Sequence, residues 1–113
     1  MTKDITLDEK TVMIEFQKSL RYLAIHLINQ WDGLTFQEQQ IIVELINGPL
    51  KRIEIANNLG ITTGSLSKPL NHLIDEVLIE LNDKRKYMIS DQILGAWLKS
   101  EYDKKGIYPF RSF

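Results

Sequence analysis

Basic side chains fall in three short stretches of the sequence, "LKRIE", "SKPL" and "NDKRKY". Lysine and arginine pair with phosphate oxygens, and arginine also makes the commonest specific contact with guanine. These basic residues are Lys51, Arg52, Lys68, Lys84, Arg85 and Lys86. Short polar side chains that can bond phosphates or base edges surround Lys68, and they are Thr63, Ser65, Ser67, Asn71 and His72. Whether the two sets form one surface depends on the elements that position them.

The stretch "IANNLGITTGSLSKPLNHL" has the spacing of a helix-turn-helix. Two helices that cross steeply need a small residue at the crossing, a turn residue that tolerates positive φ, and an aliphatic residue facing back. Ala56, Gly60 and Leu66 stand at these positions. The spacing predicts one helix over about 51–58 and a second over about 63–76, with the polar residues facing outward. A solvated helix face is the simpler interpretation of the same residues.

Pro69 stands where the middle of the second helix is expected. It can kink that helix, because a proline removes a backbone hydrogen bond at a cost of about 3 kcal/mol. Alternatively the helix begins late, with Pro69 in its first turn, where a missing N–H is harmless. A late start would leave Leu66 outside the helix and break the spacing, so we expect a kink or a locally irregular helix.

Helix and strand signals flank this motif on both sides. Capping-box patterns at Thr6 and Thr35 predict the starts of two helices, and the turn "NDKR" between short apolar runs predicts a β-hairpin. The further expected elements are helices from Thr6 to Asp32, from Thr35 to Asn47 and over 91–104, and strands over 77–81 and 86–90. The aromatic tail "GIYPF" is expected to lie against the body.

This order is that of a winged helix-turn-helix with extra N- and C-terminal helices, a mostly α fold with a small β-hairpin. We expect a single winged-helix domain over 1–113. Its parts are an N-terminal helix (1–33) that can serve oligomerisation, the winged helix-turn-helix core (34–90), and a C-terminal helix and tail (91–113). Such a fold would bring the six cations to one side of the molecule.

The long first helix carries an apolar stripe with alternating spacings of three and four, formed by Met13, Phe16, Leu20, Leu23 and Leu27. Further apolar residues broaden it, and a helix that is apolar on more than one face usually has more than one neighbour. One neighbour is the domain core. The other is expected to be a second copy, because two-fold homodimers are the commonest oligomers, or else a larger protein.

Composition excludes several classes of function. The chain has 113 residues, a net charge of −1 and no cysteine, which rules out disulfides, zinc–thiolate sites and thiol catalysis. Its apolar runs are too short to span a bilayer and its N-terminus is polar, so we expect a cytoplasmic protein without membrane contact. It shows no phosphate-binding glycine loop and no supported catalytic set. We therefore expect no enzymatic activity, no cofactor and no metal site, and a partly buried, structural His26.

From Leu34 to Pro109 the chain resembles the C-terminal winged helix of archaeal P-loop ATPases. The resemblance rests on "LTFQEQQIIVELINGP", the helix-turn-helix, and "KYMISDQILGAWLK", in which a tyrosine-bearing strand precedes an aspartate and a tryptophan-containing helix. Two positions depart from the family pattern, since Gln92 replaces a usual proline and Lys51 a usual serine or threonine cap. The resemblance implies a DNA-binding or regulatory module, and no ATP hydrolysis by these residues, which lack the ATPase module.

Together these features predict a winged-helix protein that binds double-stranded DNA, the role of a transcriptional regulator. The second helix would enter the major groove with Ser65, Ser67 and Asn71 as base readers, and the wing would lie over the backbone or minor groove. The alternative is a protein-interaction or regulatory module, such as a C-terminal fragment of a P-loop ATPase, that packs against an ATPase domain or another protein without binding DNA. Weak cationic character and Pro69 favour this alternative.

Overall fold

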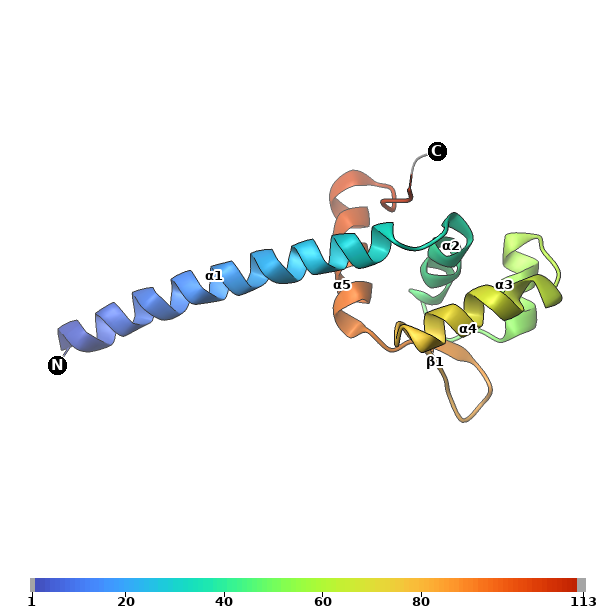
Figure 1. Cartoon of the computed structure of the whole chain (residues 1–113), viewed down its shortest axis with the longest axis horizontal. Coiled ribbons are helices and arrows are strands. Elements are labelled where there is room, and N and C mark those ends of the chain that lie inside the picture. Colours follow the sequence, from blue (N-terminus) through green and yellow to red (C-terminus); the bar gives the residue numbers. More distant parts are fainter. Residues whose placement is uncertain (1, 112–113) are drawn as a thin grey trace. The chain divides into compact units, whose positions relative to one another are not determined.

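The structure, a computed structural model, describes residues 2–111, with side chains from residue 9 onward. It divides the chain into two units, Met1–Gly33 and Leu34–Phe113 (Figure 1). This division coincides with the expected end of the N-terminal segment. No helix in the described range is both long and apolar enough to cross a membrane.

The first unit is one long helix, α1 (Thr2–Asp32). The expected capping box at Thr6 is wrong, because the helix already includes Thr6 and begins at Thr2. Neither glycine nor proline stands among the residues before Thr6, so nothing there stops a helix. The expected end is confirmed, since the N–H of Gly33 donates to the Asn29 carbonyl at 3.1 Å and the helix stops there.

The second unit begins with α2 (Phe36–Leu45), and its predicted capping box is confirmed. The Glu38 N–H donates to the Thr35 hydroxyl at 3.1 Å, and the Thr35 N–H donates to the Glu38 carboxylate at 2.8 Å. After α3 (Arg52–Leu59), Gly60 takes the left-handed conformation with φ 68°, which confirms its role as the turn residue. Both devices are local in sequence and fix where α2 starts and where α3 ends.

Of the two expectations at Pro69, the kink is wrong and the locally irregular helix is confirmed, with the irregularity before the proline. Gly64–Leu66 forms a 3₁₀ turn, η1, and α4 (Ser67–Asp75) starts directly after it, so Pro69 lies in the first turn of α4. The N–H that proline lacks there is one of the four that have no acceptor within a helix. Leu66 stays fully buried because η1 carries it into the core, so the late start of α4 does not break the spacing.

The predicted hairpin is formed by β1 (Ile79–Leu81) and β2 (Tyr87–Ile89), which pair antiparallel with Glu80 opposite Met88. The Asn82 side chain holds the turn, because its carbonyl oxygen accepts from the N–H groups of Lys84 and Lys86 at 2.9 and 3.0 Å. The hairpin therefore presents a short charged turn on a fixed base.

The chain ends in α5 (Gln92–Lys105) and a returning tail. Asp91 caps α5 by accepting from two backbone N–H groups of the first turn at 3.1 and 3.0 Å. The Phe110 ring lies edge-on to the Phe36 ring with centroids 5.4 Å apart. The Arg111 N–H donates to the Gln39 side-chain carbonyl at 2.9 Å. These contacts confirm that the tail lies against the body of its unit, over α2.

The second unit has a continuous core built from α2, α3, η1, α4, β1 and α5. Its fully buried side chains include Ile41, Ile42, Ile55, Leu66, Leu70, Leu73, Leu78, Ile79, Leu94 and Leu98. Two large apolar residues of α4 and α5, Ile74 and Ile93, lie outside this core and are 37% and 51% exposed. The predicted fold class, mostly helical with a small antiparallel hairpin, is confirmed.

Candidate nucleic-acid interface

Strand pairing brings the backbones of two predicted phosphate-binding lysines near each other. Leu50 bridges to Tyr87 in antiparallel fashion, with N–H to O=C distances of 3.0 and 2.7 Å in the two directions. Lys51 follows Leu50 and Lys86 precedes Tyr87, so the backbones of the two lysines lie near each other beside this bridge. An anion bound here would be attracted by both cations.

The turn of the hairpin adds two more cations, Lys84 and Arg85, close to Lys86 in the sequence. Lys84 and Lys86 line a shallow depression of about 320 Å³ together with Pro49, Asn82 and Asp83. Arg85 is exposed at the tip of the turn with φ 59°, a left-handed conformation that tight hairpin turns require. Asp83 is the acidic residue of the group and weakens its field.

These four cations make no ion pair with any carboxylate in the described part of the chain. The ion pairs of that part join other residues, among them Lys18 with Glu15 and Lys105 with Glu101. We define Lys51, Lys84, Arg85 and Lys86 as the wing cluster. These side chains are available to bind an external anion, although Asp83 lines the same depression and the Glu54 carboxylate accepts from the Lys51 backbone N–H at 2.9 Å.

Arg52 is positioned differently from what the sequence suggested. Its Nε and Nη2 donate to the Thr63 carbonyl at 2.9 and 2.6 Å, and Nη2 also donates to the Ser67 hydroxyl. Arg52 therefore ties the start of α3 to the turn and to the start of α4. Such a bidentate contact stabilises the crossing of the two helices and leaves Arg52 engaged within the unit.

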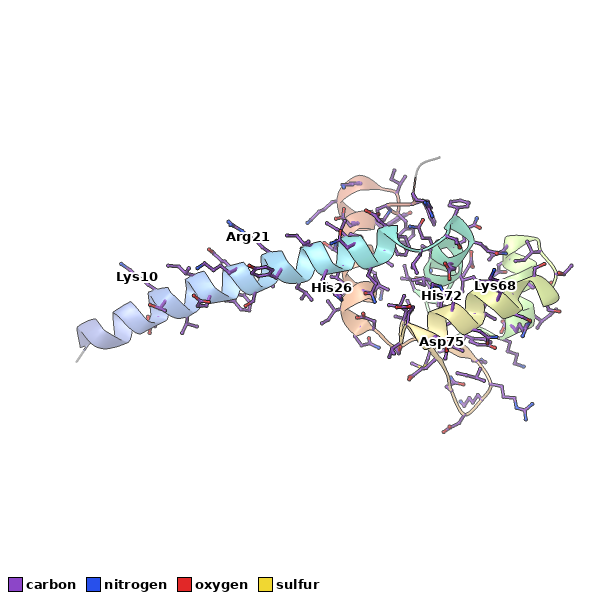
Figure 2. The ribbon with its side chains drawn as sticks, in the orientation of Figure 1. Lys10, Arg21, His26, Lys68, His72 and Asp75 are labelled. Carbon is purple, nitrogen blue, oxygen red and sulfur yellow. The ribbon has the colours of Figure 1, made fainter. Side chains whose placement is uncertain are left out.

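Among the outward residues of α4 and η1, the hydroxyls are also engaged. The Ser65 hydroxyl shares a 2.7 Å hydrogen bond with the Thr62 hydroxyl, and the Ser67 hydroxyl accepts from Arg52. Lys68 and Asn71 are exposed, three positions apart on one helix face, and have no side-chain bond to the residues that the structure covers. Figure 2 marks Lys68, His72 and Asp75 along α4. Lys68 and Asn71 thus remain available, and so does the exposed side chain of Thr63 just before η1, whose backbone carbonyl accepts from Arg52.

His72 is about half exposed, and its ring lies against two carboxylates. Its Nδ1 is hydrogen-bonded to the Glu38 carboxylate, and its Nε2 lies 3.6 Å from the Glu76 carboxylate. The hydrogen bond to Glu38 raises the pKa of His72, partial desolvation opposes this, and the charges of Glu38, Glu76 and Asp75 add to it. A phosphate at this ring would meet two acids, so the geometry does not support the expected phosphate contact of His72.

The Glu38 carboxylate is the buried end of this pair, with 5% of its side chain exposed. Burial alone would raise its pKa, but hydrogen bonds from the Thr35 backbone and from His72, with the Thr35 hydroxyl, hold the pKa below its ordinary value. Glu38 therefore joins the start of α2 to the face of α4. The sequence gives no local signal for this pair, because the two residues are 34 positions apart.

Metal binding has no support from the described side chains, among which no group of three or more histidine, cysteine, aspartate or glutamate residues could hold an ion. The expectation of a partly buried His26 is wrong, since this side chain is exposed on α1. No protein-family model matches the chain, and no curated protein sequence matches it.

Proposed function

We propose that residues 34–111 form a winged helix-turn-helix domain that binds double-stranded DNA. In this proposal α3 and α4 are the helix-turn-helix and the β1–β2 hairpin is the wing. The observation that carries it is the wing cluster, in which strand pairing and a tight turn gather four cations without carboxylate partners in the described part. The role that fits best is a cytoplasmic transcriptional regulator.

Phosphate contacts supply most of the affinity in this proposal. Lys68 on α4 joins the wing cluster as a phosphate partner, and Asn71 is the side chain best placed to read a base, because asparagine can bond adenine through two hydrogen bonds. No arginine lies on the outward face of α4. Because arginine makes the commonest specific base contact, sequence discrimination is expected to be modest and salt dependence steep.

The first test is fluorescence anisotropy of a labelled mixed-sequence duplex between about 50 and 300 mM salt. The wing cluster and Lys68 together can neutralise five phosphates. The logarithm of affinity should therefore fall with the logarithm of salt concentration at a slope of about −4.5. Arg52 and His72 are left out of this sum because both are engaged within the protein.

Replacing Lys84, Arg85 and Lys86 by alanine should reduce the slope to about −2, since two cations remain. The matched control replaces Lys99, Lys104 and Lys105 by alanine. It removes the same charge from α5, which Figure 1 shows on the opposite side of the second unit from α3. The control should keep the original slope, and an equal effect of both variants would point to net charge alone.

A protein-interaction module is the second candidate, and exposed apolar side chains favour it. Ile53 on α3 and Leu81 on β1 are 52% and 51% exposed. An ATPase domain or another protein would then cover such side chains, as the resemblance to P-loop ATPases implies. Absence of DNA binding at about 50 mM salt and tens of micromolar protein, where phosphate contacts are strong, would leave this function as the better one.

A further inference from the structure

The helix α1 exposes a regular apolar seam. Met13, Phe16, Leu20 and Leu23 follow one another at spacings of three, four and three residues, and they are 58%, 58%, 48% and 36% exposed. The next member of the same stripe is Leu27. This alternation is the heptad pattern of a and d positions in coiled coils. The seam is therefore a continuous apolar row along several turns of α1.

The exposed surface is large enough to matter for association. The four seam side chains are 36–58% exposed, so pairing two seams with their flanking residues removes on the order of 1,000 Å² from water, the lower limit for a specific protein interface. Isolated apolar residues are common on protein surfaces, but a continuous row along several turns of one helix is a mark of an interaction site.

The residues beside the seam favour a partner with the same face. From residue 12 to residue 26 the flanking e and g positions are Val12, Gln17, Ser19, Ala24 and His26, without a lysine, arginine or acid among them, and Lys10 takes the e position at the N-terminal end of the seam. Two copies would therefore meet no like charges beside Phe16, Leu20 and Leu23. Ser19 and Ala24 are small and allow close approach of two helices. The charged residues of this stretch lie elsewhere on the helix, and two of them, Glu15 and Lys18, lie 3.9 Å apart on the same copy.

We propose that the seam of Met13, Phe16, Leu20 and Leu23 pairs with the same seam of a second copy of this chain in a two-stranded coiled coil. A repeat of 3.5 residues is complementary to itself, and a symmetric dimer covers both faces at once. A charged partner would gain nothing from these neutral flanks. Glu9, two turns before Phe16 in the same register, ends the seam at its N-terminal side. The proposal stands on α1 alone and holds whether or not the second unit binds DNA.

The test is the mass of the full chain in solution, by light scattering after size exclusion and by sedimentation equilibrium. The wild-type protein should have twice the 13.2 kDa of one chain. Leu20→Glu, in the middle of the seam, should give a monomer, because a carboxylate would be buried without a partner. Phe16→Ala shortens the seam without adding charge, and should raise the dissociation constant by at least about tenfold through lost apolar contact.

Tyr22→Glu is the matched control. Tyr22 lies outside the seam on α1, is 75% exposed, and undergoes the same change from an apolar side chain to a carboxylate. This variant should remain a dimer. A wild-type monomer at about 100 µM, well above the dissociation constants of specific interfaces, would overturn the proposal. Equal dissociation by Leu20→Glu and Tyr22→Glu would also overturn it, and circular dichroism confirms that each variant keeps its helices.

Discussion

Val77 is a β-branched residue held in the left-handed conformation, with φ 59°, directly after α4. The Leu78 N–H donates to the Leu73 carbonyl at 3.0 Å and the Val77 N–H to the Ile74 carbonyl at 2.9 Å. This is the Schellman motif, whose left-handed position is usually filled by glycine. The buried pair of Leu73 and Leu78 supplies the apolar contact that accompanies the motif. Val77 itself is 71% exposed, so its side chain packs little.

Val77→Gly should therefore stabilise the protein. The left-handed conformation costs an ordinary residue about 1–2 kcal/mol, and the greater freedom of glycine in the unfolded chain offsets about 0.5–1 kcal/mol of the relief. The free energy of unfolding in urea should rise by about 0.5–1 kcal/mol. Val77→Ala, which keeps the Cβ, should change it less. A loss of stability in Val77→Gly would mean that the valine side chain makes a contact of its own.

The Glu38–His72 pair makes stability depend on pH in two directions. The pKa of His72 is raised, so its contribution is complete below about pH 6.5, the ordinary histidine value, and is lost as pH rises through the raised pKa. The pKa of Glu38 is lowered, so its contribution is present above about pH 4.3, the ordinary glutamate value, and is lost as pH falls through the lowered pKa. The pair stabilises the fold most between these limits.

His72→Gln should remove the loss of unfolding free energy that the wild-type protein shows on going from about pH 6 to about pH 8, where histidine titrates. The effect is expected to be modest, because 47% of the His72 side chain is exposed and solvent screens the pair. A full pH slope in His72→Gln would show that another group is responsible.

At the scale of elements, what the sequence predicted correctly was encoded locally. The Thr35–Glu38 capping box lies within one helical turn, and Gly60 needs only its own φ, so both could be predicted. The roles of Arg52 and His72 could not, because their partners lie 11, 15 and 34 positions away and become neighbours only through packing. Arg52 and Lys51 are neighbouring cations in the sequence, but packing brings the Thr63 carbonyl only to the side chain of Arg52.

Pro69 shows how a rule about one residue can fail when an element boundary moves. In the middle of a helix, replacing this proline by alanine would stabilise the protein by about 3 kcal/mol. In the first turn of α4 the proline costs no hydrogen bond, and its ring is buried. Pro69→Ala should instead lower the free energy of unfolding by about 1–2 kcal/mol, through lost apolar burial and a more flexible unfolded chain. The two positions of Pro69 predict opposite changes in the free energy of unfolding, which urea unfolding of Pro69→Ala measures. A clear gain in stability would support the kinked helix instead.

At the scale of the whole molecule, a dimer through α1 would carry two DNA-binding units. Linking two binding modules raises the overall affinity by about 10²–10⁴ when one DNA molecule can engage both. A duplex of about 12 base pairs, little more than one helical turn, has room for one unit, whereas a duplex of about 40 base pairs can reach both. The ratio of the affinity for the long duplex to the affinity for the short duplex therefore measures how strongly the two units bind together.

The wild-type protein should prefer the long duplex to the short one at least about tenfold more strongly than Leu20→Glu does, at one fixed salt concentration. Leu20→Glu has the same surface on its second unit, so it corrects for the larger number of sites on longer DNA. Tyr22→Glu should behave like the wild type, because its seam is intact. Anisotropy titrations of the three proteins on both duplexes give the ratios. Equal ratios of long-duplex to short-duplex affinity in all three proteins would mean that each unit binds DNA alone. If α1 still pairs, the geometry of the dimer would then prevent both units from reaching one duplex.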